Sequence, residues 1–142
     1  MTFSLDSNVM IAAVCEWHEH HMTATDAIET RLAAGQRLTT PVHAVTEAYA
    51  VLTRLPPPHR LAPGDAWSLV SSNFVEGGSL VGLRPFVQIE MLRDLAASGK
   101  GGGRTYDALI AATARHAGVD ELLTFNPGHF DVDAEGLKIV GL

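Results

Sequence analysis

Cysteine, positive charge and long apolar runs are all scarce in this sequence. The one cysteine, Cys15, cannot form an intramolecular disulfide, so we expect it to pack as a small apolar residue in a reducing cytoplasm. No apolar run approaches the roughly 18 residues of a membrane-spanning helix, and the N-terminus lacks a basic stretch followed by a signal-like apolar region. We therefore expect a cytoplasmic protein that does not contact a membrane.

Positive charge is outnumbered by negative charge. Ten Lys and Arg stand against 16 Asp and Glu, which gives a formal net charge of -6. This balance argues against tight, non-specific binding of nucleic acid, because such binding depends on neutralising phosphates with cations. It leaves a nuclease open, since a metal site needs clustered carboxylates that themselves lower the net charge. Eight of the ten cations are arginines, whose planar guanidinium suits phosphate.

Apolar residues are plentiful, in contrast. With 142 residues and 46% hydrophobic content, the chain suits a single domain, 1–142, with its own core. Short β-like runs alternate with longer helical runs, which predicts an α/β fold with a parallel-rich central sheet of about five strands and helices on both faces. We expect strands at 3–5, 37–40, 79–83, 121–125 and 137–140, and helices at 8–15, 21–34, 41 to the prolines 56–58, 63–75, 86–97 and 105–117.

The third helix has the clearest local signals. Thr40 is expected as its N-cap and Pro41 as its first residue, and the triple proline 56–58 as its end. One stripe should face the core, and the opposite face should carry Glu47 in line with a histidine and an arginine. The stripe is Val42, Val45, Tyr49 and Leu52, and the polar neighbours of Glu47 are His43 and Arg54.

Three acids, Asp6, Glu47 and Asp107, stand out as candidates for a functional site. Asp6 follows the first strand directly, where parallel sheets bind their ligands, and Asp107 opens a helix that is otherwise apolar. Burying one ionised carboxylate costs several kcal/mol unless something pairs with it, and a divalent cation would be such a partner. Ordinary roles remain open for each: a helix N-cap for Asp6, a solvated pair for Glu47, and a favourable contact with the helix dipole for Asp107.

Motifs in a fixed order connect these acids. "LDSNV" follows the first strand, "TEAYAVL" lies in the third helix, and "YDALIAATA" precedes "LLTFNPGHF". In order and spacing these motifs resemble the PIN-domain ribonucleases, and among them the VapC toxins of toxin–antitoxin pairs. The resemblance spans Leu5 to Phe130, and it implies a PIN-like fold with a parallel sheet covered on both faces.

The resemblance also implies a catalytic site. Asp6, Glu47 and Asp107 match the family carboxylates that hold Mg²⁺ or Mn²⁺. Oxygen ligands without paired Cys or His favour these hard cations, which activate a water for attack on the scissile phosphorus. Such an attack yields a 5′-phosphate and a 3′-hydroxyl, and the sequence leaves open which acid serves as general base.

Further residues are implied around the three acids. Asn126 stands where relatives often place a fourth acid, with Asp131 as a substitute further along, so the number of metals stays open. Ser7 and Thr124 are expected to orient the carboxylates. Arg54, Arg60, Lys100 and Arg104 could contact RNA phosphates, although ordinary surface roles are equally open.

Partners follow from the resemblance as well. VapC toxins commonly form homodimers and are held inactive by a VapB antitoxin, so an RNA substrate, an antitoxin and a second copy of the chain are expected partners. Apolar candidates for these contacts lie in one helix, although a core role is the alternative for each. They are Trp67, Leu69, Val70 and Phe74.

Two other classes of function stay in view. A phosphatase of the haloacid dehalogenase type also places an Asp after its first strand, but its motif wants a second Asp where this chain has Asn8. A PIN-like binding module without catalysis is the other alternative, for which Asn126 is the one hint. "HEHH" at 18–21 fits a solvated loop better than a metal site, and "GKGGG" at 99–103 lacks the features of a phosphate loop.

Overall fold

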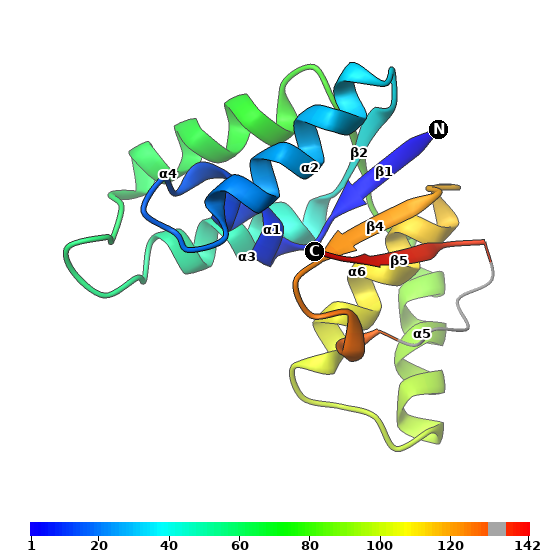
Figure 1. Ribbon diagram of the computed structural model, residues 1–142. Helices are drawn as coiled ribbons and strands as arrows, with labels where there is room; N and C mark the ends of the chain where they lie inside the picture. Colours follow the sequence, from blue (N-terminus) through cyan, green and yellow to red (C-terminus); the bar gives the residue numbers. More distant parts are fainter. Residues whose placement is uncertain (131–135) are drawn as a thin grey trace.

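The structure is a computed structural model that describes residues 1–130 and 136–142. In the described residues five parallel strands form one sheet in the order β3-β2-β1-β4-β5, and the arrows of β1 and β4 run side by side in the same direction in Figure 1. This confirms the predicted α/β fold with a parallel sheet. The strands are β1 (Thr2–Leu5), β2 (Arg37–Pro41), β3 (Ser79–Val81), β4 (Glu121–Thr124) and β5 (Lys138–Gly141).

Helices cover both faces of the sheet, as predicted. Of the six α-helices in the described residues, α1 to α4 gather on one side of the sheet in Figure 1, and α5 and α6 pack together on the opposite side. A parallel connection needs a crossover, and the sequence supplies a helical run between successive strands from β1 to β4. The first group is α1 (Ser7–Val14), α2 (His21–Ala33), α3 (Val42–Leu52) and α4 (Pro63–Val70), and the second is α5 (Pro85–Ala97) and α6 (Arg104–His116).

The strand β1 is the centre of the sheet and places the site. Its Phe3 and Leu5 are completely buried, as expected for a strand covered on both faces. From β1 the chain adds β2 and β3 on one side of the sheet and then β4 and β5 on the other side. Parallel sheets bind ligands at the carboxyl end of the strand where the chain changes sides in this way. Asp6 follows at this point, and its backbone N–H donates to the carbonyl of Leu123 in β4 at 2.9 Å.

The start of α3 differs from the prediction. Pro41, not Thr40, is its N-cap, because pairing of Pro41 with Val81 keeps this residue extended at the end of β2. The helix also ends earlier than predicted, at Leu52: Thr53 is its C-cap, and the next N–H, of Arg54, donates to the carbonyl of Val51 in a tighter turn. Arg54 therefore lies beyond the helix and does not share the face of Glu47.

The core holds most of the predicted apolar stripes. Val45 and Leu52 of α3 are buried, but Val42 is 49% exposed because the helix begins only at this residue. In the predicted helix 63–75, the last turn is a π-helix at Ser71–Val75, which follows α4 without a break. Val70 and Phe74 pack in the core, whereas Leu69 is half-buried and Trp67 is exposed.

Two expectations from composition can be compared with the structure. Cys15 is buried in the main hydrophobic cluster, which agrees with a small apolar packing role. Among the residues that the structure describes, no helix is both long and apolar enough to span a membrane.

Candidate active site

Asp6 is a buried carboxylate held on both of its oxygens. It is the N-cap of α1, where the backbone N–H of Ser7 donates to Oδ1 at 2.7 Å. The hydroxyl of Thr124 donates to Oδ2 at 2.8 Å from the end of the adjacent strand β4. The ordinary N-cap role weighed for Asp6 is therefore present, together with a second contact that capping does not need.

Thr124 joins three segments at the carboxyl end of the sheet. Besides donating to Asp6, its hydroxyl oxygen accepts from the backbone N–H of Asn126 at 3.0 Å and faces the side-chain amide of Asn8 at 3.4 Å. Asn8 in turn accepts from the backbone N–H of Phe125 at 3.3 Å. This network fixes the Asp6 carboxylate against the turn that follows β4. The serine hydroxyl of Ser7 is only a distant contact, 3.5 Å from Oδ1.

Glu47 lies in the second turn of α3 and contacts His43 one turn earlier. Its Oε1 is 2.8 Å from Nε2 of His43, an i,i+4 pair on the partly buried face of the helix. The ring of His43 stacks on Tyr106 of α6 with ring centroids 5.3 Å apart. The predicted alignment of Glu47 with His43 is confirmed, and α6 holds the imidazole from the other side.

Asp107 lies in the first turn of α6 and is partly buried. Its Oδ2 is 3.4 Å from Nδ1 of His129, which belongs to the short 3-10 helix η2 (Pro127–His129) after β4. Burial raises the pKa of Asp107, while the charge and hydrogen bond of His129 and the charge of Arg104 oppose this. His129 is a residue that the sequence analysis missed; the motif "NPGHF" contains it but does not show that it would reach α6.

Electrostatics bring the three acids together. The pKa of Asp6 is raised to about 6: burial is the largest cause, the Thr124 hydrogen bond opposes it, and the negative charge of Asp107 adds to it. The Ser7 N–H lowers the pKa and the charge of Glu47 raises it again. The carboxylates thus act on one another across the carboxyl end of the sheet. Clustered negative charge of this kind is what a divalent cation neutralises.

The donor set fits a hard cation in its chemistry. Three carboxylates and the Asn126 carbonyl are oxygen ligands of the kind that Mg²⁺ and Mn²⁺ prefer. As placed, however, Glu47 faces His43 and Asp107 faces His129. In the described part of the chain, no three His, Cys, Asp or Glu side chains are gathered closely enough to hold one metal ion. Binding would therefore require these carboxylates to rotate away from their imidazole partners.

Other predicted residues lie around this edge. Asn126 is exposed and follows Phe125 after the end of β4, and its backbone N–H donates to the hydroxyl oxygen of Thr124. Asp131, the substitute for it, lies outside the described residues. Arg104 begins α6 within the electrostatic reach of Asp107. Arg54 is exposed after α3, and the guanidinium of Arg60 donates to the carbonyl of Leu55 at 2.8 Å.

The "HEHH" segment lies where the sequence predicted. His18 and His20 occupy the loop between α1 and α2, and His21 is the first residue of α2, with Nδ1 2.9 Å from the carbonyl of Ala12. The backbone N–H of His20 donates to Nδ1 of His18 at 3.0 Å. The loop interpretation therefore rests on these contacts of the histidines with backbone and with one another.

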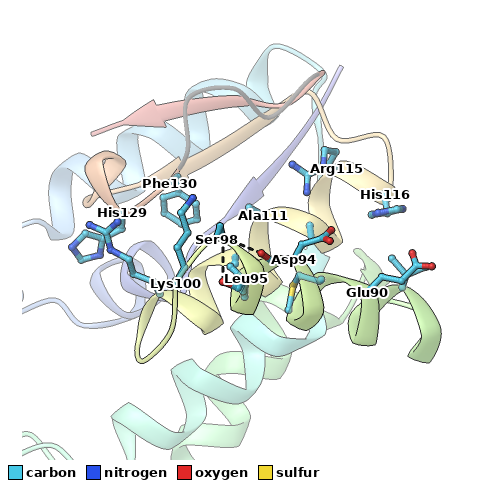
Figure 2. Close-up of a pocket in the computed structure, with 15 residues that line it drawn as sticks. Glu90, Asp94, Leu95, Ser98, Lys100, Ala111, Arg115, His116, His129 and Phe130 are labelled. Carbon is cyan, nitrogen blue, oxygen red and sulfur yellow. Dashed lines mark hydrogen bonds between the residues drawn. The ribbon is translucent and has the colours of Figure 1, made fainter.

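A cavity of about 310 Å³ opens between α5 and α6 (Figure 2). Met91 and Ala111 contribute apolar surface, and Lys100 and His129 approach from one end. The three candidate carboxylates do not line this cavity, but His129 does, and it also contacts Asp107. The cavity is therefore a neighbour of the acidic site, joined to it through this histidine.

Comparison with protein families gives one match over most of the chain. Residues 4–135 match the family described as PIN domain. Among curated proteins, Ribonuclease VapC40 of Mycobacterium tuberculosis is 37% identical over 119 residues, which are 84% of this chain and 82% of that protein.

Solved structures share the fold. VapBC2 from Rickettsia felis, bound to a DNA fragment from its promoter, superposes with a TM-score of 0.70 over 99% of this chain and 98% of that chain, at 17% identity. Mycobacterium tuberculosis VapC20, described as a sarcin-ricin loop cleaving toxin, gives 0.63 over 93% and 92%, also at 17% identity. DNA-bound VapBC from Salmonella typhimurium gives 0.69 over 99% and 98%, at 20% identity. At these identities the likeness shows the fold.

Proposed function

We propose that this chain, which belongs to the PIN-domain family and within it to the VapC proteins, is a metal-dependent endoribonuclease and the toxin of a toxin–antitoxin pair. The observation that carries the proposal is the group of acids at the carboxyl end of β1. The three acids come from three separate parts of the chain, and the negative charges of Asp107 and Glu47 still reach Asp6 and raise its pKa. A haloacid dehalogenase phosphatase is set aside by the family match.

Each residue has a role in this proposal. Asp6, Glu47 and Asp107 would hold Mg²⁺ or Mn²⁺, with the Asn126 carbonyl as a further ligand. The bound cation supplies an activated water and stabilises negative charge on the phosphoryl oxygens. Thr124, through its hydrogen bond to Asp6, and Ser7, through its N–H, keep one carboxylate in a fixed orientation. Arg104 and Arg54 are our candidates for contact with RNA phosphates.

The histidines add a condition to this site. His43 and His129 contact Glu47 and Asp107, and a cation would compete with them for the same oxygens. An RNA chain that brings phosphate to the site competes for the histidines in turn. Cation and substrate binding should therefore support each other at this edge of the sheet.

We propose three further properties from the same membership. The protein acts in the cytoplasm, an antitoxin of the VapB kind blocks its site, and two copies form a homodimer. The cavity between α5 and α6 supports an antitoxin segment, because it is partly apolar and is lined by His129, which contacts Asp107. The outer face of α5 supports the homodimer, because none of its residues is buried and Phe86, Ile89 and Leu92 are exposed.

The test is cleavage of purified total RNA. We expect Mg²⁺ or Mn²⁺ to support cuts that leave 5′-phosphates, and a chelator to abolish them. Asp107→Asn should lower the rate about 100-fold or more, because it removes a charge that cation binding needs. Asp65→Asn is the matched control, since Asp65 also lies in the first turn of a helix but is exposed in α4.

The outcomes separate the remaining alternatives. Equal cleavage by Asp107→Asn and Asp65→Asn would remove Asp107 from the site. No cleavage by folded, antitoxin-free protein with either metal would favour the binding module without catalysis.

A further inference from the structure

A row of aromatic rings runs along the surface to the candidate site. It consists of five rings from three segments, and we call it the ring row. His59 comes from the loop after α3, and Phe125 directly follows β4. The members between them lie in the loop between α1 and α2. The ring row is His59, Trp17, His18, His20 and Phe125.

Successive rings in this row touch. Trp17 stacks on His59 with centroids 4.0 Å apart and an angle of 19° between the ring planes. His18 follows in tilted contacts, 5.8 Å from Trp17 and 5.7 Å from His20. His20 then stacks on Phe125 at 4.7 Å and 23°. The row thus connects the α3–α4 loop to the residue beside Thr124, the partner of Asp6.

The ring row is open to solvent along most of its length. Trp17 is 49% exposed, His20 and His59 are also exposed, and His18 and Phe125 are half-buried. Rings that served only to pack loops together would be expected to lose more of their surface, because burial is what makes aromatic packing favourable. Here π-faces and edges remain available to a ligand.

The position of the row suggests what the ligand is. The protein carries a net charge of -6, and its candidate site adds three carboxylates, so phosphate contacts alone are a poor source of affinity for RNA. Stacking of bases on aromatic side chains does not depend on that charge and accepts every base. Burial and then the charge of His20 lower the pKa of His18, with Glu19 opposing them, which favours the neutral ring for stacking.

We propose that the ring row is a subsite for unpaired RNA bases, which stack on Trp17 and its neighbours and lead the strand to the acids. This inference rests on the proposed ribonuclease function and names its substrate class as single-stranded or loop RNA. Paired bases keep their faces inside the helix and cannot reach the rings, so duplex RNA would not use the subsite.

Binding tests the proposal without cleavage. In a chelator, a fluorescent ten-nucleotide oligoadenylate is titrated with the protein, and anisotropy gives the Kd. We expect Trp17→Ala to raise Kd about ten-fold, and Trp17→Phe, which keeps a ring, to stay within about three-fold of the parent. Trp67→Ala is the matched control, because Trp67 is also a tryptophan, is 51% exposed, and has no ring contact among the described residues.

Two competitor strands distinguish bases from phosphates. An abasic strand with the same number of phosphates and a blunt RNA duplex should each compete at least ten-fold more weakly than the oligoadenylate. The Trp67→Phe protein keeps Trp17 as its one tryptophan, and its fluorescence should be quenched by the oligoadenylate but not by the abasic strand. Equal competition by the abasic strand would overturn the proposal, because phosphates would then explain the binding.

Cleavage provides the link to function. For a single-stranded RNA substrate, Trp17→Ala should raise KM about ten-fold and leave kcat within two-fold, with the thermal midpoint unchanged. If the parent cuts RNA and folded Trp17→Ala shows the parent's Kd and KM, the ring row is not a base subsite. If the parent binds bases through Trp17 but never cuts, the ribonuclease function fails and the subsite remains.

Discussion

Asp6 combines burial with a negative charge, and this combination affects stability before any cation binds. Its pKa of about 6 in the folded protein lies above the ordinary value of 3.8. Protonated Asp6 therefore stabilises the fold fully below about pH 3.8, and this contribution is lost as the pH rises through about 6. Above that pH the ionised carboxylate is a cost on the order of 3 kcal/mol.

Replacing Asp6 by Asn should remove this pH dependence. In metal-free protein, we compare the free energy of unfolding of Asp6→Asn with that of the parent. We expect this difference to be about 2–3 kcal/mol more favourable to the variant at pH 7 than at pH 4. Asn can still cap α1 by accepting the Ser7 N–H. Urea unfolding at several pH values measures the difference. The exposed acid Asp26 provides the control Asp26→Asn, which should keep the pH dependence of the parent, and an equally steep dependence in Asp6→Asn would contradict the assignment.

A bound cation should reverse the effect of that charge. Mg²⁺ or Mn²⁺ that binds only the folded protein stabilises it by about 2.7 kcal/mol at one hundred times its Kd. We expect the thermal midpoint of the parent to rise with metal concentration, and the midpoint of Asp6→Asn to stay nearly constant. Asp65→Asn should respond like the parent. A metal response retained in Asp6→Asn would place the cation elsewhere.

Residue chemistry was partly readable from the sequence. The positions of Asp6 after β1 and of Asp107 in the first turn of α6 followed from local patterns alone. The contacts of His129 with Asp107 and of Asn8 with Phe125 depend on how distant segments meet, and local patterns do not encode this. The ring row was missed for the same reason, because its stacked pairs join residues far apart in the chain.

At the scale of elements, β5 and η2 approach each other closely. A Cβ atom added to Gly141 would lie 2.9 Å from Cγ of Pro127. Gly141→Ala should therefore destabilise the protein by about 1–3 kcal/mol, because β5 or η2 must move. Since η2 carries His129, the contact with Asp107 should weaken too.

Denaturant unfolding checks this prediction against a second glycine. Gly64 lies in α4 with no heavy atom within 4 Å of an added Cβ. Gly64→Ala should be neutral or stabilise by up to about 1 kcal/mol, since Ala favours helix. If Gly141→Ala were as stable as Gly64→Ala, η2 would be able to move away from the added Cβ atom without lowering the free energy of unfolding, and the prediction would be wrong.

Elements were predicted better in kind than in their ends. Hydrophobic patterns indicated every strand and α-helix of the described structure, because a buried sheet and its covering helices leave periodic traces in the sequence. The ends of α3 were wrong: Thr40 and Pro41 read as a helix start, but sheet pairing of Pro41 with Val81 prevailed. Arg54 was consequently assigned to a helix face that does not extend so far.

At the scale of the whole molecule, the outer face of α5 is the feature to test. Phe86 is 85% exposed, with Ile89 one turn further along the same helix at 52%. If this face joins two copies, Phe86→Glu should convert the dimer into a monomer, since a charge would be buried without a partner. Light scattering after size exclusion measures the mass. Met22→Glu, at another exposed apolar residue on α2, should leave the dimer intact.

The strand order also sets when the site can exist during synthesis. The central strand β1 leaves the ribosome before the other four strands of the described structure. Asp6, however, cannot form its hydrogen bond until Thr124 has been made, 118 residues later in the chain. At translation rates of about 5–20 residues per second, this interval is roughly 6–24 s. We expect a nascent chain to remain without an assembled acidic edge until Thr124 has been synthesised. A chain with the proposed ribonuclease activity would therefore be unable to cut RNA until that point of its own synthesis.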